Sequence, residues 1–348
     1  MSFGARALIR LGALKHNFEV IRNRVPDAKI MAVIKANAYG HGMVAVAESL
    51  PDVDAFAVAR VPEAILLREN GINANIVLLA GVLNQDEMQS AIEQNLQPVV
   101  HCQEQVELLA ACHTGSVSVW LKFDTGMNRL GFEPRRAAEL IERLQGLRSV
   151  RELGLMTHLS SADEMEGDTT SQQLAQFEEL SADFAGAVSI GNSAGSLGWA
   201  DATAVSSGKD GARWIRPGIA LFGISPFSDS TGPDLGLKPV MQFEARLIAV
   251  KPLAKGASVG YKATYKSAAD TFLGVISAGY GDGYSRHFRT GTPILINGRI
   301  VPLIGNVSMD MIAIDLGADA TDQVGDIATL WGDGLPVEEV APWANAIP

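Results

Sequence analysis

Short apolar runs alternate with amphipathic stretches from residue 30 to residue 224, with a period of about 25 residues. This alternation is typical of consecutive strand–helix units around a parallel sheet. We interpret eight runs as strands: Ile30–Ile34, Ala55–Ala59, Ile76–Ala80, Pro98–His101, Val117–Phe123, Leu153–His158, Val188–Gly191 and Ile219–Phe222.

Helices are predicted between these runs, where apolar residues recur at three- and four-residue spacing. The candidates include Asn84–Gln94, Glu104–Ala111, Pro134–Leu144 and Ser171–Phe184. Eight strand–helix units in about 200 residues favour a closed (β/α)₈ barrel of the TIM type. An open, doubly wound sheet is the alternative.

A polar, turn-rich segment at Ser225–Pro233 ends this pattern and is typical of a linker. Short β-rich runs separated by glycines follow it, at Met241–Val250, Phe272–Ser277, Pro293–Ile296, Met311–Asp315 and Gln323–Leu330. We therefore predict an N-terminal barrel over residues 1–230 and a C-terminal β-rich domain over residues 231–348. Within residues 1–11, the stretch Arg6–Leu11 is a candidate strand of the second domain.

Charge and composition narrow the class of function. The 28 Lys and Arg residues against 39 Asp and Glu give a net charge of −11 without a basic tract, which argues against a nucleic-acid partner. No apolar run approaches the ~18 residues of a membrane helix, and the first residues lack a secretory signal pattern. We expect a cytoplasmic protein with no membrane contact. The two cysteines, Cys102 and Cys112, indicate neither a disulfide framework nor a metal site.

Polar residues follow several of the predicted strands. In a (β/α)₈ barrel the reacting groups lie at the carboxyl ends of the strands. A single such residue can simply mark where a buried strand meets water, but several at one face favour a polar pocket at the barrel mouth. The residues in question are Lys35, Lys122, His158, Asn192 and Arg216.

The segment around Lys35 is the most informative. A lysine shielded by apolar neighbours loses its proton more easily than a solvated one and can act as an imine-forming nucleophile or as a base. Gly40 and Gly42 allow close approach of the backbone to a ligand, and the Tyr39 hydroxyl can donate to an anion. The spacing does not name that anion.

Two further segments suggest a phosphate site. Asn192–Gly195 opens a predicted short helix and offers hydroxyl and backbone donors, and Arg216–Ile219 adds a glycine amide. Phosphate sites after the seventh and eighth strands recur in this barrel architecture. A helix cap is the simpler interpretation of Asn192 alone.

Taken together, these segments resemble the bacterial alanine racemase family, which depends on pyridoxal phosphate. The resemblance extends nearly from end to end, and no single segment would be specific. It is carried by Ala32–Gly42, Lys122–Gly131, Thr157–Leu159, Asn192–Ala194, Arg216–Ile219, Val259–Tyr261, Gly279–Tyr284 and Ser308–Asp310.

The resemblance implies a two-base mechanism on a pyridoxal phosphate imine. Lys35 would carry the cofactor and act as the base on one face of the α-carbon, with Tyr261 of the partner subunit on the other face, because inversion requires both. Arg216 would face the pyridine nitrogen, and as a permanent cation it would keep the ring a weaker electron sink. His158 would lie between Arg216 and that tyrosine.

The remaining roles also follow from the resemblance. Arg129 and the Met309 amide would bind the substrate carboxylate, Lys122 would steady Arg129 as a possible carbamate, and Tyr280 and Asp310 would line the entrance. The cofactor phosphate would be held by Tyr39, Ser193, Gly218 and Ile219, and Asn192 would also bind the cofactor. The family usually continues beyond Pro348 into a tyrosine that contacts this phosphate. Either the sequence is truncated there or this member lacks that contact, which would weaken cofactor retention.

The function implied is alanine racemisation, which interconverts L-alanine and D-alanine for peptidoglycan precursors, in a homodimer with shared active sites. A racemase of broad specificity and a pyridoxal-phosphate carrier without turnover are the alternatives. A decarboxylase of this plan would carry a cysteine in the stretch Asn306–Asp310, where this chain has Ser308.

Overall fold

The computed structural model describes residues 4–204 and 211–348. These residues form two compact units. The barrel unit is the described part of Leu14–Leu221 together with Pro226–Asp229, and the C-terminal unit comprises residues 4–13, 222–225 and 230–348. Residues 1–3, part of the stretch searched for a secretory signal, lie outside the described residues.

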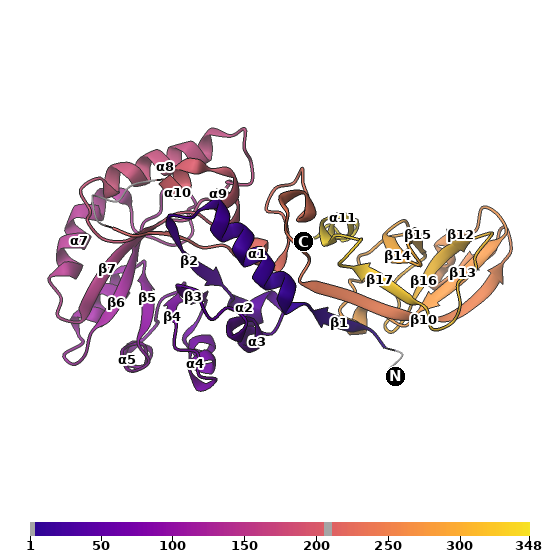
Figure 1. Ribbon diagram of the computed structural model, residues 1–348, viewed down its shortest axis with the longest axis horizontal. Helices are drawn as coiled ribbons and strands as arrows, with labels where there is room; N and C mark the ends of the chain where they lie inside the picture. The colour runs from indigo at the N-terminus through magenta and orange to yellow at the C-terminus, as the bar shows by residue number, and fades with distance from the viewer. Residues whose placement is uncertain (1–3, 205–210) are drawn as a thin grey trace. The chain divides into compact units, whose positions relative to one another are not determined.

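In the described part of the barrel unit, eight parallel strands close into a barrel (Figure 1). The first and last strands complete the ring, with Ile30 opposite Ile215. The prediction of a closed (β/α)₈ barrel is therefore confirmed, and the open-sheet alternative is wrong. The strands are β2 (Ala28–Val33), β3 (Ala55–Val58), β4 (Asn75–Leu78), β5 (Leu96–Val100), β6 (Val117–Lys122), β7 (Val150–Met156), β8 (Val188–Ser189) and β9 (Arg213–Ile215).

The barrel interior is filled by side chains that point inward from alternate strand positions. Met31, Val77, Val99 and Met156 belong to this core cluster, and all are buried. Trp120 meets Trp214 edge to face, with ring centroids 5.8 Å apart. Such a packed interior fixes the strand ends that carry the polar residues.

The helices of this part of the chain follow the strands. The four helices predicted from the sequence correspond to α5 to α8, with ends shifted by up to three residues. The helices are α1 (Leu11–Arg24), α2 (Lys35–Tyr39), α3 (Met43–Glu48), α4 (Val61–Glu69), α5 (Gln85–Glu93), α6 (Gln103–Ala110), α7 (Ala137–Gln145), α8 (Asp168–Ser181), α9 (Ser193–Gly198) and α10 (Ala200–Ala204).

The predicted eighth strand is wrong. The barrel is completed by β9, whereas Ile219–Phe222 forms a 3₁₀ helix. Pro217 has no N–H to donate and so cannot continue the strand ladder on that side. The run after it is still fully buried at Ala220 and Leu221. A short apolar run does not distinguish a buried strand from a buried helical turn.

The C-terminal unit is an antiparallel β structure organised around one long strand. Its described strands follow the order β1-β10-β13-β16-β15-β14-β17, and β17 pairs back onto β10. Arg6 of β1 lies opposite Glu244 of β10. The strands are β1 (Arg6–Ile9), β10 (Met241–Leu253), β11 (Ser258–Val259), β12 (Tyr265–Lys266), β13 (Thr271–Ile276), β14 (Pro293–Ile296), β15 (Arg299–Ile304), β16 (Ile312–Gly317) and β17 (Ile327–Trp331).

The predicted β-rich character of this unit is confirmed, but β15 was missed, because Pro302 interrupts its apolar pattern. The hydrophobic core contains Leu247, Ile294, Leu303, Ile314 and Leu330. The unit also contains the short helix α11 (Val337–Val340) and 3₁₀ helices at Pro233–Leu235, Tyr261–Ala263, Tyr280–Asp282 and Ala341–Ala344, while Pro134–Arg136 forms one in the barrel unit.

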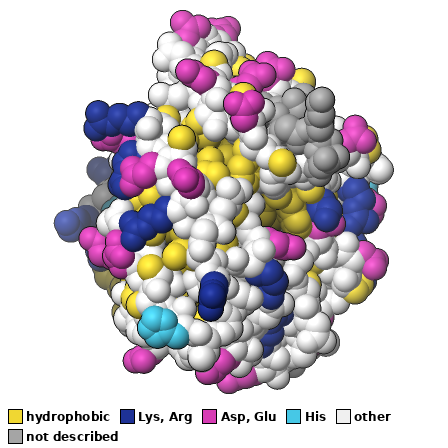
Figure 2. All heavy atoms as spheres, turned by 90° about the vertical axis from the view of Figure 1, so that its left-hand side faces the viewer, with side chains coloured by type: hydrophobic (Ala, Val, Ile, Leu, Met, Phe, Trp, Pro, Cys, Tyr) yellow, Lys and Arg dark blue, Asp and Glu magenta, His cyan; other side chains and the backbone are white. Residues whose placement is uncertain are grey.

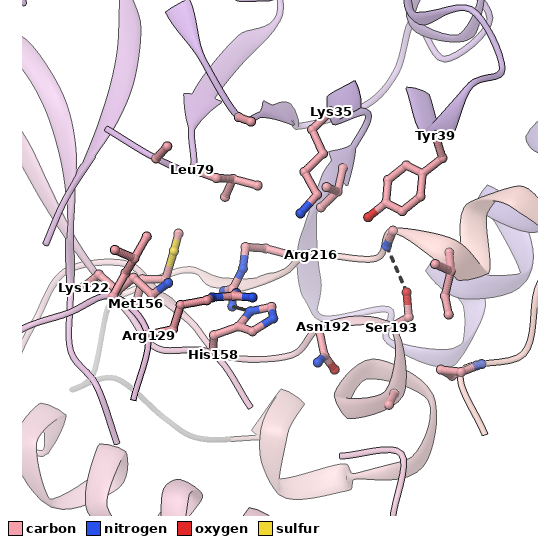
Figure 3. Close-up of a pocket in the computed structure, with 18 of the residues that line it drawn as sticks. Lys35, Tyr39, Leu79, Lys122, Arg129, Met156, His158, Asn192, Ser193 and Arg216 are labelled. Carbon is pink, nitrogen blue, oxygen red and sulfur yellow. Dashed lines mark hydrogen bonds between the residues drawn. The ribbon is translucent and has the colours of Figure 1, made fainter. Parts of the chain in front are cut away.

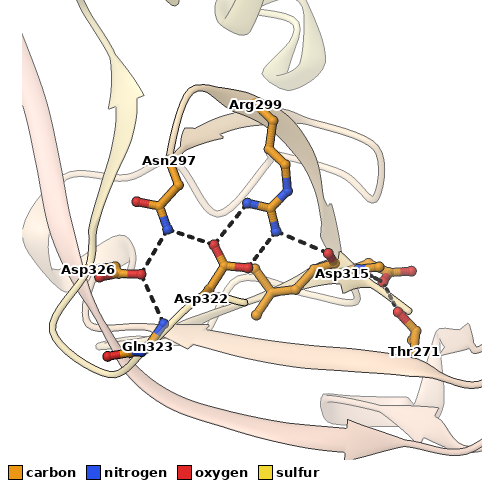
Figure 4. A network of polar contacts seen from close by, with 9 residues as sticks. Thr271, Asn297, Arg299, Asp315, Asp322, Gln323 and Asp326 are labelled. Atoms are coloured by element: carbon orange, nitrogen blue, oxygen red, sulfur yellow. Dashed lines mark hydrogen bonds and ion pairs between the residues drawn. The ribbon is translucent and has the colours of Figure 1, made fainter. Parts of the chain in front are cut away.

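A polar network fastens the β14–β15 hairpin of the C-terminal unit to the segment before β17 (Figure 4). Arg299 Nη1 donates to Asp322 Oδ1 at 2.9 Å and Nη2 donates to Oδ2 at 2.5 Å. Asn297 Nδ2 bridges Asp322 Oδ1 and Asp326 Oδ2, at 2.9 and 2.8 Å. The hydrogen bond from Arg299 lowers the pKa of Asp322. Arg299 therefore faces the opposite charge of Asp322. The hydrogen bonds to Asp326 Oδ2 come instead from neutral N–H groups, those of Asn297 and Gln323.

The surface agrees with the charge count. The face shown in Figure 2 carries cationic and anionic side chains intermixed, with hydrophobic side chains gathered near its centre. Among the described side chains on that face, the Lys and Arg residues do not form a continuous patch. Among the residues that the structure describes, no helix combines the length and the apolar character needed to span a bilayer.

Candidate functional site

A cavity of about 450 Å³ lies in the barrel unit at the carboxyl ends of the strands. All ten site residues that the sequence predicted within the barrel line it. They are Lys35, Tyr39, Lys122, Arg129, His158, Asn192, Ser193, Arg216, Gly218 and Ile219. Figure 3 shows Lys35 and Tyr39 pointing into the cavity, with Arg216 and His158 across from Lys35.

Lys35 lies directly before a turn of left-handed helix. The φ angles of residues 36 to 39 are between 53° and 55°, a region that non-glycine residues rarely enter. Gly40 continues the turn at φ 85°, where a glycine carries no penalty. The turn projects both the Lys35 amine and the Tyr39 hydroxyl toward the cavity.

The Lys35 amine is easier to deprotonate than a solvated lysine. Burial first, and the charge of Arg129 second, lower the pKa of Lys35, while the nearby Glu63 carboxylate acts in the opposite direction. A neutral amine is the reactive form toward a carbonyl carbon. The location of Lys35 and its lowered pKa together suit a nucleophile or a base.

Arg216 is buried and held by the ends of the neighbouring strands. Its Nη2 donates to the carbonyl oxygens of Thr157 and Ile190, at 2.5 and 3.0 Å, and Nη1 donates to the Ser189 hydroxyl. Burial lowers the pKa of Arg216 to about 9, so it remains a cation at pH 7. The strand ends therefore fix a positive charge at the bottom of the cavity.

His158 lies against this arginine. Burial, and then the charge of Arg216, lower the pKa of His158 to about 2, so its ring is neutral at pH 7. Arg216 Nη2 lies 3.3 Å from His158 Nδ1. A guanidinium only donates, so Nδ1 accepts and the ring proton is on Nε2.

Lys122 ends β6 and is only 7% exposed. Burial, followed by the charges of Arg216 and Arg129, lowers the pKa of Lys122 to about 8. Part of the Lys122 population is therefore uncharged near neutral pH. This is the form that reacts with an electrophile such as carbon dioxide.

Arg129 is positioned by a loop whose structure was not predicted from the sequence. Asp124 Oδ1 accepts the N–H groups of Gly126 and Asn128, and Oδ2 accepts that of Arg129, each at 3.0 Å. Burial alone would raise the pKa of Asp124, but these N–H donors outweigh it and lower the pKa. An aspartate five residues before the arginine was the available signal, since Asp side chains organise turns in this way.

Three elements meet at the end of the cavity near Tyr39. Ser193, the first residue of α9, accepts the N–H of Gly218 at 2.9 Å and that of Ala220 at 3.3 Å through its hydroxyl (Figure 3). A Cβ at Gly218 would collide with the Tyr39 hydroxyl, so a larger residue there would require Tyr39 to move. Asn192 lines the cavity and also caps α9 by accepting the N–H of Gly195 at 2.9 Å.

The other predicted site residues lie in the C-terminal unit, on loops that are hydrogen-bonded to one another. The N–H of Tyr280 donates to the Ser308 carbonyl at 3.0 Å, and that of Gly281 to the Met309 carbonyl at 2.8 Å. Asn306 Nδ2 donates to the Tyr261 carbonyl at 3.0 Å. The Tyr261 side chain is 73% exposed, and Met309 and Asp310 are exposed as well. The four predicted residues thus share one surface of this unit.

The barrel cavity concentrates positive charge. Lys35, Lys122, Arg129 and Arg216 line it, and within the described residues none of these four forms a salt bridge. Among the described lining residues Asp163 is the one carboxylate, so the four cations outnumber it. A cleft of net positive charge attracts ligands of the opposite sign. The cavity is therefore suited to a small, multiply anionic ligand.

Comparison with known proteins agrees with this arrangement. The family model described as the alanine racemase N-terminal domain matches residues 9–226, and that of the C-terminal domain matches residues 240–348. The alanine racemase of Aeromonas hydrophila is 46% identical over 99% of this chain and 95% of its own length. That of Yersinia pestis is 46% identical over 97% of this chain and 92% of its own.

Solved structures show the same relationship. The biosynthetic alanine racemase of Pseudomonas aeruginosa superimposes with a TM-score of 0.91 at 40% identity, over 99% of this chain and 95% of that one. An alanine racemase of Bartonella henselae, described with covalently bound pyridoxal phosphate, gives a TM-score of 0.87 at 28% identity, over 99% and 95% of the two chains. This chain belongs to the alanine racemase family.

Proposed function

We propose that this protein is an alanine racemase that interconverts L-alanine and D-alanine, supplies D-alanine for peptidoglycan precursors, and uses pyridoxal phosphate as its cofactor. The observation that carries the proposal is the cavity itself. It combines a lysine of lowered pKa with unpaired cations at the carboxyl ends of one barrel.

The residues present fit pyridoxal phosphate. Tyr39, Ser193 and the Gly218 backbone supply hydroxyl and N–H groups beside the first turn of α9, a combination that suits a phosphate. Asn192 and Ile219 complete that end of the cavity. Lys35 would hold the aldehyde carbon covalently, and Arg216 would face the ring nitrogen. When bound, the cofactor withdraws electrons from the substrate α-carbon and makes its proton easier to remove.

Substrate orientation is assigned to Arg129 and to the loop surface of the C-terminal unit. The Arg129 guanidinium would bind the alanine carboxylate in a forked pair of hydrogen bonds, and the Met309 N–H of the opposite chain would add a third. Tyr280 and Asp310 would line the entrance. Lys122, once carbamylated, would become an anion that pairs with Arg129 and steadies it.

Proton transfer is assigned to two residues on opposite faces of the α-carbon. The Lys35 amine would take or return the proton on one face, and Tyr261 of the partner subunit would act on the other. His158 has its proton on Nε2 because Nδ1 accepts from Arg216. Donation from this N–H would stabilise the phenolate and make the tyrosine a better base.

The test of the reaction is racemisation in deuterated water. L-alanine incubated with the purified chain and pyridoxal phosphate should yield D-alanine carrying deuterium at the α-carbon, and Lys35→Ala should yield neither. Binding of the cofactor without exchange or D-alanine would contradict a racemase and indicate a carrier. A panel of larger amino acids in the same assay measures the breadth of specificity.

The homodimer is tested by mixing two inactive variants. If the active site is shared, chains carrying Lys35→Ala and chains carrying Tyr261→Ala should recover activity together, since the mixed dimer contains one intact site. Recovery should follow the statistical fraction of mixed dimers. Failure of the mixture to recover, while size-exclusion chromatography shows that mixed dimers form, would contradict the shared site.

A further inference from the structure

Three consecutive helices of the barrel unit begin with the same side-chain cap. The third residue of each helix turns its side chain back and accepts a backbone N–H from four residues earlier. Glu63 of α4 accepts from Ala59 at 2.7 Å, Glu87 of α5 from Leu83 at 2.7 Å, and Gln105 of α6 from His101 at 2.8 Å. Gln105 shows that an amide oxygen is sufficient for this cap.

Two of these side chains also reach the segment that follows an earlier strand, β2 for Glu63 and β4 for Gln105. Each side chain matches the backbone group that it meets there. Gln105 Nε2 donates to the carbonyl of Val82 at 3.2 Å. Glu63 meets a donor instead of an acceptor. Its Oε1 accepts the N–H of Ala36 at 2.7 Å. A carboxylate has two acceptor oxygens, whereas an amide has one acceptor and one donor. The N–H of Ala36 therefore explains why position 63 needs a carboxylate.

Ala36 is the first residue of the left-handed turn. Four consecutive non-glycine residues in this region cost roughly 1–2 kcal/mol each, so the turn needs support from its surroundings. Glu63 holds the start of the turn. Asn37 fastens its other end, where its Oδ1 accepts the N–H of Met43 at 2.9 Å.

We propose that Glu63 is a positioning residue of the active site, whose carboxylate holds the left-handed turn that aims Lys35 and Tyr39 into the cavity. The proposal rests on the proposed function, because those two side chains are the ones assigned to the cofactor. Glu63 acts on the site through the Ala36 backbone and through the charge that it presents to Lys35, and not by contact with the reacting atoms.

The isosteric variant Glu63→Gln separates the two roles of this side chain. The amide oxygen can still cap α4, as Gln105 caps α6, but the amide NH₂ cannot accept from Ala36. Glu63→Ala removes both bonds. Glu87→Gln is the matched control, since Glu87 is the same residue at the same helix position and neither it nor Leu83 lines the cavity.

The first measurement is amide hydrogen exchange in the chain without cofactor. In Glu63→Gln, exchange across residues 36–42 should rise on the order of tenfold, the loss expected for a hydrogen bond to a charged group. Exchange at residues 59–61 should stay at the wild-type rate. Glu63→Ala should raise both, and Glu87→Gln should leave residues 36–42 unchanged.

The second measurement is the dissociation constant of pyridoxal phosphate. It should weaken on the order of tenfold in Glu63→Gln and stay at the wild-type value in Glu87→Gln. Wild-type exchange at residues 36–42 in Glu63→Gln, or wild-type affinity, would overturn the proposal and leave Glu63 as a helix cap. Failure of the wild-type chain to bind pyridoxal phosphate would contradict the proposed function. The exchange rates of residues 36–42 in Glu63→Gln and in the wild type would then be the test of whether Glu63 holds the turn.

Discussion

The barrel cavity and the polar network of the C-terminal unit contain similar side chains in opposite arrangements. In the network, Arg299 is paired with Asp322, and Asn297 donates to both Asp322 and Asp326 (Figure 4). In the cavity, Lys35 and Arg129 stand near each other without a salt bridge among the described residues. Removing one partner of a pair of the first kind destabilises a fold, because the other charge is left uncompensated. Unpaired charges in a cleft are kept at a cost to stability, which makes the cavity the candidate binding site of the chain.

The largest effect is expected at Lys35. Lys35→Ala should abolish covalent attachment of pyridoxal phosphate and lower racemisation by more than about 10⁴-fold, because it removes both the attachment point and one base. The free energy of unfolding should not fall, because Lys35→Ala removes a half-buried cation that the neighbouring cations repel. Absorbance of the bound cofactor and urea denaturation measure the two effects, and a variant that remained active would remove Lys35 from the chemistry.

A smaller effect on binding is expected at Gly218. In Gly218→Ala the new methyl group collides with the Tyr39 hydroxyl, so Tyr39 must move away from the cluster proposed to hold the phosphate. Pyridoxal phosphate should bind on the order of tenfold more weakly, in proportion to one lost hydrogen bond to an anion. Gly40 is unsuitable as a control because its φ is positive, so any side chain there would strain the backbone. Gly12 is a suitable control position, because a methyl group added there would meet open space. Equal weakening in Gly12→Ala would contradict this account of Gly218.

The sequence predicted the barrel and the residues around the cavity because both depend on local patterns. Apolar runs identified seven of the eight strands correctly, and polar residues at their ends, such as Lys35 and His158, do meet in space. Glu63 and Asp124 were not predicted. Their roles arise from contacts with backbone N–H groups, and in the case of Glu63 the partner, Ala36, is 27 residues away.

The paired network should respond to mutation in stability alone. Asp322→Asn keeps the shape of the side chain but removes the charge that Arg299 faces, so we expect a loss of about 1–3 kcal/mol in the free energy of unfolding. Cofactor binding should be unchanged. Urea denaturation and the dissociation constant of pyridoxal phosphate test the two halves of this prediction, and a change in affinity as large as that of Gly218→Ala would contradict the separation of roles.

The last difference between the two regions is the pH dependence of their contributions to stability. The pKa of Lys122 is about 8 in the folded chain and near 10.5 when unfolded, so the unfolded state binds more protons between these values. Stability should therefore gain a rising contribution from pH 8 to 10.5, and Lys122→Met should remove it. Asp322 has a lowered pKa, so its contribution is present above its unfolded value near 4 and is lost as the pH falls through its folded value. Urea denaturation across both pH ranges measures these slopes, and an unchanged alkaline slope in Lys122→Met would contradict the first.

The central claim is that the unpaired, easily deprotonated lysine at the end of β2 carries the cofactor. Borohydride reduction of the protein with bound pyridoxal phosphate, followed by peptide mass spectrometry, tests it most directly. The account predicts a reduced pyridoxyl group on Lys35. A label on Lys122 in place of Lys35, or no label on Lys35, would contradict it.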